Sequence, residues 1–194
     1  MNSFFRLIVL CLLVSGSLFG CGNDSTSTGG ACKSALGWVE FVTLKPSGIV
    51  AKAKLDTGAK TSSLQADNIE MFTRDGKQWV RFTYERKRRA AVHGVPAVPH
   101  QRQVIEAPLK RMVRIKQHTV DFVERPAIDM DIQIGDKTYT TEFTLTSRDA
   151  FIYPVLLGRR FLEDNGTVVD ASHIHITGAP DDLTEAHGHG ETAR

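Results

Sequence analysis

Cysteine and an excess of either charge are what this 194-residue sequence has least of. Three cysteines exclude a fold held together by several disulfides. Lys and Arg number 24 against 22 Asp and Glu, a formal net charge of +2, which argues against bulk binding of nucleic acid. The hydrophobic share of 41% is that of an ordinary globular chain. We therefore expect one folded domain or a little more, and not a disordered or polytopic membrane protein.

Two catalytic motifs are also absent. A zinc hydrolase typically carries His-Glu-x-x-His and an ATP-binding P-loop carries Gly-x-x-x-x-Gly-Lys-Ser/Thr, and the sequence contains neither. The close histidine pair outside the tail, His173 and His175, is expected on one face of a late strand. A solvated strand face explains that pair better than metal binding does. We therefore expect neither a metal ion nor a cofactor.

The N-terminal residues have the pattern of a secretory signal peptide. Arg6 alone forms the basic region at the start, and residues 7–14 form an apolar stretch too short to cross a bilayer. Residues 18–21, Leu-Phe-Gly-Cys, resemble a bacterial lipobox, which implies lipidation of Cys21; plain secretion or a retained anchor are the alternatives. Gly22, rather than Asp, after the cysteine fits sorting to the outer membrane. The expected location is the cell envelope of a Gram-negative-type bacterium, with the chain lipid-anchored on the periplasmic side.

Composition divides the chain into four parts. We expect a signal peptide at 1–20, a flexible tether at 21–36, a folded domain at 37–178 and a disordered tail at 179–194. If Cys21 is lipidated, Cys32 has no partner within the mature chain. The stability of the domain must then come from its core.

Within the domain, the dominant hydrophobic period is two. It predicts strands over 38–44, 49–55, 79–84, 128–134 and 139–145. Turn residues separate them at 46–48, 75–76 and 135–136, and the Asp75-Gly76 pair is typical of a type I′ hairpin. Residues 159–165 form one helical segment, which Gly166 ends. The sequence predicts an all-β barrel or sandwich with one short C-terminal helix.

Two short motifs interrupt apolar strands. Asp56-Thr57-Gly58-Ala59 follows the strand at 49–55, and Leu156-Leu157-Gly158-Arg159 ends a later one. A carboxylate directly after an apolar strand is costly unless it is hydrogen-bonded or faces a cleft. Asp56 is therefore the candidate functional residue, and the alternative is that it only caps a turn.

With these motifs the sequence resembles the retropepsin fold of aspartic proteases. It is also similar to a bacterial branch labelled "ATP-dependent zinc protease" and associated with RimK-type ligases. The resemblance covers nearly all of the domain and rests on residues 37–40, 53–64, 78–82, 124–126 and 145–149. It implies a closed acid-protease barrel in which Asp56 is catalytic, Gly58 shapes the site, and Thr57 bonds across a twofold axis.

The same resemblance implies supporting roles for the neighbouring residues. Arg159 resembles the retropepsin arginine that braces the dimer or the helix. The other residues expected to support the site or to line its cleft are Ala59, Lys60, Leu157 and Gly158.

An aspartic-protease mechanism needs two carboxylates about 3 Å apart that share a proton. One chain supplies one candidate, so two copies would have to pair about a twofold axis to join their Asp56 residues. Ala59 stands where many pepsin-like enzymes have serine. Loss of that hydroxyl is expected to raise the apparent pKa values of the carboxylate pair and to favour a less acidic optimum.

The stretch from Glu85 to Lys116 is strongly basic, with nine Lys or Arg against two Glu. It is expected to be a solvated loop, or else a flap or rim that attracts an anionic substrate, lipid headgroups or cell-wall polymer. Residues 93–100 within it have the Pro and Gly content of a mobile lid, and the Asp75-Gly76 hairpin is a second flap candidate. Arg148 and Asp149 could form an internal ion pair.

Together these patterns favour an envelope-anchored, retropepsin-like aspartic peptidase. Its expected partners are a peptide or protein substrate, a second copy of the chain and, through the lipid, a membrane, but not nucleic acid. A non-catalytic module that binds peptides or cell wall on the same fold is the alternative. A metal-dependent hydrolase ranks lower, because only the label of the branch supports it.

Overall fold

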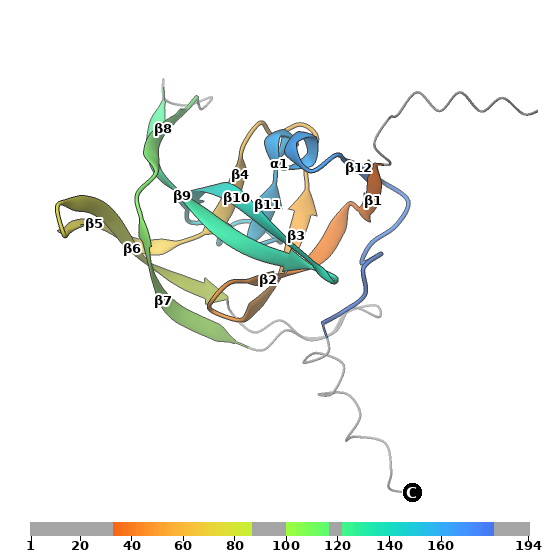
Figure 1. Cartoon of the computed structure of the whole chain (residues 1–194), viewed down its shortest axis with the longest axis horizontal. Coiled ribbons are helices and arrows are strands. Elements are labelled where there is room, and N and C mark those ends of the chain that lie inside the picture. The colour runs from red at the N-terminus through yellow and green to blue at the C-terminus, as the bar shows by residue number, and fades with distance from the viewer. Residues whose placement is uncertain (1–32, 87–99, 117–121, 181–194) are drawn as a thin grey trace, which may run out of the picture. The chain divides into compact units, whose positions relative to one another are not determined.

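The computed structural model describes residues 33–86, 100–116 and 122–180, which contain twelve strands and one short helix (Figure 1). The predicted strands coincide with β2, β3, β6, β9 and β10, of which the last three are longer than predicted. The elements are β1 (Ser34–Gly37), β2 (Val39–Leu44), β3 (Ile49–Leu55), β4 (Ser62–Gln65), β5 (Asp67–Arg74), β6 (Lys77–Arg86), β7 (Gln101–Pro108), β8 (Arg111–Ile115), β9 (Val123–Ile134), β10 (Lys137–Thr146), β11 (Val155–Leu157), α1 (Arg159–Asp164) and β12 (Thr167–Asp170).

Six strands of the described chain close into a barrel in the order β10-β4-β11-β3-β2-β9, and the antiparallel pairing of β9 with β10 completes the ring. β8 extends this sheet beyond β9. Apolar side chains from all around the ring fill its interior without solvent exposure, among them Val42, Leu44, Ile128, Ile132 and Phe143. The prediction of a closed all-β barrel with one short C-terminal helix is confirmed.

The strands β5, β6 and β7 form a separate antiparallel sheet (Figure 1). Val80, Phe82 and Tyr84 of β6 are fully buried and belong to the same core as the barrel. The turn between β5 and β6 has positive φ at Asp75 (50°) and Gly76 (71°), as a type I′ hairpin requires.

Much of the basic stretch predicted as a loop or rim consists of strands. β7 and β8 occupy 101–108 and 111–115, and the end of β6 precedes them. Residues 87–99, with most of the predicted lid, lie outside the described residues. His100, the last residue of that lid, lies with its Nε2 3.2 Å from Glu85 Oε1.

The N-terminal boundary of the domain lies earlier than predicted. β1 pairs in parallel with β12, Ser34 opposite Thr167, so residues 34–36 belong to a strand and not to the tether. The remaining parts of the predicted signal peptide, tether and tail at 1–32 and 181–194, including Cys21, lie outside the described residues. Where the structure does describe the chain, it contains no helix with the length and apolar character needed to span a bilayer.

The prediction of a late strand around His173 and His175 is wrong. The structure has turns there: His175 has a positive φ of 54°, its N–H donates to Val39 O of β2 at 2.8 Å, and the N–H groups of Ile176 and Thr177 donate to the fully buried Glu40 carboxylate at 3.0 and 3.4 Å. His173 Nδ1 lies 2.8 Å from Asp170 Oδ2, whereas the His175 ring packs on Phe41 with the ring centres 4.3 Å apart. The two imidazoles therefore do not share a strand face.

Candidate active site

The Asp56-Thr57-Gly58 loop begins where β3 ends and is joined by backbone hydrogen bonds to the second motif. Asp56 N donates to Leu157 O at 2.8 Å, and Arg159 N donates to Ala59 O at 2.8 Å. β11 runs parallel to β3, with Leu157 opposite Leu55. The two motifs, about a hundred residues apart in the sequence, thus form one structural unit.

Gly158 allows these two motifs to approach each other. A Cβ at this position would lie 2.7 Å from the carbonyl carbon and oxygen of Thr61. The Gly158 N–H donates to Ser62 Oγ at 3.1 Å, which ties the start of α1 to β4. Any side chain at 158 would push the two backbones apart.

The Arg159 guanidinium binds the Asp56-Thr57-Gly58 loop at its C-terminal end. Its Nη1 donates to the carbonyl oxygens of Thr57 and Gly58, each at 3.2 Å. This brace is a structural contact within the chain. The bond that Thr57 was predicted to make across a twofold axis involves a second copy and stays a prediction.

The Asp56 carboxylate receives hydrogen bonds at both oxygens. Oδ1 accepts from the N–H groups of Gly58 (2.9 Å) and Ala59 (3.2 Å), and Oδ2 accepts from Lys54 Nζ (3.2 Å). Partial burial alone would raise the pKa of Asp56, but the hydrogen bonds from Lys54, Gly58 and Ala59 outweigh it and hold the pKa below its ordinary value. The side chain remains 23% exposed, so the ionised carboxylate is open to a ligand.

Lys54 is a site residue that the sequence interpretation missed. The signal was available, because residues two apart on a strand project to the same side and Lys54 stands two before Asp56. The strand pattern explained Lys54 as an ordinary polar position, so its contact with the carboxylate was not foreseen.

Arg148, predicted only as a possible partner of Asp149, is buried beside the site. Its Nη1 donates to Ser63 Oγ at 2.6 Å and its Nε to Tyr153 O at 3.0 Å, whereas Asp149 Oδ1 accepts from Gln65 Nε2. Burial, reinforced by the charge of Arg125 and opposed by that of Asp56, lowers the pKa of Arg148 to about 10. The buried positive charge of Arg148 therefore interacts with Asp56.

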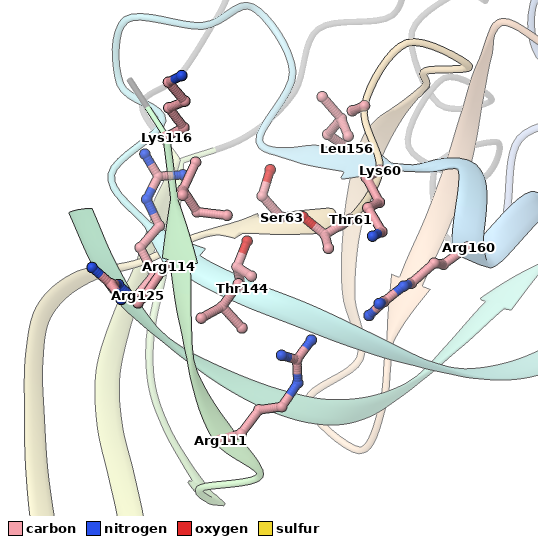
Figure 2. A pocket seen from close by; sticks show the side chains of 13 residues that line it. Lys60, Thr61, Ser63, Arg111, Arg114, Lys116, Arg125, Thr144, Leu156 and Arg160 are labelled. Carbon is pink, nitrogen blue, oxygen red and sulfur yellow. The ribbon is translucent and has the colours of Figure 1, made fainter. Parts of the chain in front are cut away.

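A cavity of about 510 Å³ adjoins the loop at Ala59 (Figure 2). β8 forms one wall, and residues 59–61 with Arg160 of α1 form the other. Six of its lining residues are cationic, namely Lys60, Arg111, Arg114, Lys116, Arg125 and Arg160. We call this cavity the basic cleft. The second flap candidate, the Asp75-Gly76 hairpin, contributes none of the described residues that line it.

The charge of the basic cleft is only partly neutralised. Arg111 Nε donates to Glu142 Oε2 at 3.0 Å, and Arg160 Nη1 lies 3.8 Å from Glu142 Oε1. Burial lowers the pKa of Arg125. Across the described ranges, no carboxylate lies within ion-pair distance of the remaining cleft cations, Lys60, Arg114, Lys116 and Arg125. The cleft is thus suited to an anionic ligand.

Within the described residues, no three His, Cys, Asp or Glu side chains lie close enough together to hold a metal ion. His173 contacts Asp170, and the His175 ring packs on Phe41, as described above. Ala59, Leu157, Gly158 and Arg159 come together beside Asp56 through the loop, β11 and the start of α1, whereas Lys60, whose carbonyl oxygen accepts from the Arg160 N–H at 3.3 Å, lines the basic cleft.

Comparisons with known proteins found curated relatives, a solved structure and a family model that match this chain. Two curated relatives are named probable alpha-L-glutamate ligase. The one from Shewanella pealeana is 33% identical over 155 residues, covering 78% of this chain and 31% of its own length. The one from Desulfotalea psychrophila is 37% identical over 133 residues, covering 68% of this chain and 27% of its own length. The chain therefore spans less than a third of the curated relatives it matches.

Among solved structures, a Legionella pneumophila protein of unknown function superposes with a TM-score of 0.61 at 33% identity, over 75% of this chain and 99% of that one. A family model described as the retropepsin-like aspartic endopeptidase RimB matches residues 35–180, which include the Asp56 loop, β11 and the basic cleft. The chain belongs to this RimB-like family of retropepsin-like proteins.

Proposed function

We propose that this chain is an aspartic peptidase whose active form joins the Asp56 carboxylates of two copies. The Asp56 loop is the observation that carries this proposal. Backbone amides orient one carboxylate oxygen, Arg159 braces the loop carbonyls, and the carboxylate stays partly exposed. An aspartate that only caps a turn needs no more than hydrogen bonds from the backbone amides. The contacts of Arg159 with the loop carbonyls go beyond that need, so they favour a functional role for the Asp56 carboxylate.

In such a pair, one carboxylate is ionised and the other keeps a proton. The ionised Asp56 accepts a proton from a water molecule, whose oxygen attacks the carbonyl carbon of the peptide bond. The protonated Asp56 donates to the carbonyl oxygen; as the C–N bond breaks, the leaving nitrogen takes up the proton that came from water, and a hydroxyl of the intermediate returns its proton to the carboxylate pair. The amides of Gly58 and Ala59 keep the carboxylate oriented throughout.

The substrate class that we propose is a peptide rich in Asp or Glu. The basic cleft begins at Ala59, directly after the Asp56 loop, and presents six cations. An acidic side chain next to the bond to be cut would meet Lys60 or Arg160. The curated relatives are named for ligation of glutamate, and a glutamate-rich chain is the kind of anionic peptide that this cleft fits.

The experiment compares the purified chain with Asp56→Asn on an acidic peptide and on an uncharged peptide of equal length. We expect cleavage of the acidic peptide by the parent chain only, with EDTA without effect. Cleavage that survives Asp56→Asn, or that EDTA abolishes, would contradict the aspartic mechanism.

A non-catalytic peptide-binding module is the second candidate. It is favoured by the contact of Asp56 with Lys54, since the carboxylate of a single chain already has a charged partner. Analytical ultracentrifugation separates the two candidates. A chain that stays monomeric at high concentration, binds the acidic peptide and leaves it intact is a module and not a peptidase.

We also propose that a lipid at Cys21 anchors the chain in the cell envelope, on the basis of the lipobox-like sequence. Labelled fatty acid should be incorporated into the parent chain and not into Cys21→Ser, which should appear in the soluble fraction. Equal labelling of both chains would rule this anchor out.

A further inference from the structure

Lys54 occupies a position that the barrel fixes. It lies within β3, opposite Val39 of β2 on one side and Leu156 of β11 on the other. Asp56 directly follows β3 and stands two residues after Lys54, so the alternation of the strand brings both side chains to the same side. The ammonium therefore reaches Asp56 Oδ2, at 3.2 Å, from a rigid element and not from a loop.

The two oxygens of the Asp56 carboxylate have different kinds of donor. Backbone amides donate to Oδ1, and the Lys54 ammonium donates to Oδ2. Ala59 contributes its backbone N–H, but its methyl side chain has no donor. We propose that Lys54 is a positioning residue of the Asp56 site, whose ammonium takes the place of the hydroxyl that Ala59 lacks and holds the second carboxylate oxygen.

Among the described residues, the charged groups found close to Asp56 or its loop are cationic. Lys54 approaches from β3, Arg148 acts from the segment between β10 and β11, and Arg159 binds the loop carbonyls. Lys54 holds the pKa of Asp56 below its ordinary value by its hydrogen bond and its charge, and Arg148 interacts with Asp56 through its charge. A hydroxyl donor would be neutral, so Lys54 provides the same hydrogen bond with a full positive charge in addition.

The consequence for the proposed peptidase concerns its pH range. A pair of Asp56 carboxylates works while it keeps one shared proton. Two Lys54 ammoniums oppose that proton, so the pair loses it at lower pH than it would without them. Lys54 thus offsets the shift toward a less acidic optimum that Ala59 alone would produce.

The test titrates Asp56 in the full chain, by the 13C shift of its carboxyl carbon, with Asp56→Asn identifying the signal. Lys54→Met keeps the apolar stem and removes the donor, whereas Lys54→Arg keeps the charge. The midpoint of the Asp56 titration should move to higher pH in Lys54→Met, stay close to the parent value in Lys54→Arg, and return part of the way in Lys54→Met with Ala59→Ser. An unchanged midpoint in Lys54→Met, or an equal rise in Lys54→Arg, would overturn the proposal.

A second readout separates positioning from a general structural effect. The descending limb of kcat should move to higher pH in Lys54→Met while KM changes little, whereas a merely damaged site would lose kcat evenly at every pH. The pH consequence rests on the proposed function, but the titration does not. If no chain cleaves any peptide, the peptidase proposal fails, while the midpoints of the Asp56 titration still decide the role of Lys54.

Lys54 is 43% exposed, so we expect the variants to fold. If the Lys54→Met chain does not fold, Lys54→Gln replaces it.

Discussion

At the scale of single residues, Gly158 determines whether the two motifs can meet. Gly158→Ala would place a methyl group 2.7 Å from backbone atoms of Thr61, which cannot move aside as a flexible side chain could. We expect a loss of about 1–3 kcal/mol in the free energy of unfolding, measured by urea denaturation. Val168→Ala, at a position 42% exposed, is the control and should change this free energy by no more than about 0.5 kcal/mol. Equal losses in both chains would show that the close approach is not maintained in solution.

At the scale of elements, the strand period predicted the barrel well and the cleft poorly. The alternation of apolar residues in the sequences of β2, β3 and β10 is a local signal, and it predicted these strands although β2 and β3 are buried at nearly every position. The cleft depends on which strands are neighbours, since its cations come from the loop after β3, from β8, from β9 and from α1. The basic stretch was visible in the sequence. The pairing of β8 with β9, which places Arg111 and Arg114 along one wall of the cleft, was not.

The basic cleft gives a prediction about substrate binding. Replacing both Arg114 and Arg125 by Gln should raise KM for an acidic peptide about tenfold and change kcat little, because these cations bind substrate and transition state alike. Lys137→Gln, outside the cleft at the start of β10, is the matched control. Added salt should weaken binding to the parent chain more than to the double variant, since salt screens exposed charges. A rise in KM of the same size for an uncharged peptide would argue against charge recognition.

The contact between Glu142 of β10 and Arg111 of β8 gives a prediction about pH. The hydrogen bond from Arg111, helped by Lys110, holds the pKa of Glu142 below its ordinary value of 4.5. The stabilisation is therefore complete above pH 4.5 and is lost as the pH falls through the lowered value. We expect Glu142→Gln to cost about 1 kcal/mol at pH 7 and to lose less stability than the parent chain on acidification.

Urea midpoints at pH 7 and at about pH 3.5 measure this difference. Glu70→Gln, whose parent side chain is 68% exposed and only 3.8 Å from Arg81, is the control and should follow the parent chain at both pH values. Parallel losses in Glu142→Gln and the parent chain on acidification would refute the role given to the Glu142 contact.

At the scale of the whole molecule, a nearly neutral chain combines a strongly basic cleft with one candidate catalytic carboxylate. The net charge of +2 conceals this arrangement, because acidic residues elsewhere balance the cleft. An anionic peptide drawn to the cleft would reach the Asp56 loop through Ala59, which lines the cleft. Hydrolysis by a shared proton still needs a second carboxylate, and a symmetric pair of chains supplies one without any further residue.

Mixing chains tests this requirement directly. If each active site combines Asp56 from two copies, equal amounts of parent and Asp56→Asn chains that exchange freely leave about one quarter of the dimers with both carboxylates. Cleavage of an acidic peptide per parent chain should therefore fall to about half, because half of the parent chains are paired with an inactive partner. Addition of Asp136→Asn, which changes only the turn between β9 and β10, should instead add activity. A single-chain mechanism would leave the activity of the parent chain unchanged when Asp56→Asn is added, so the mixing curve distinguishes a half-site from a complete one.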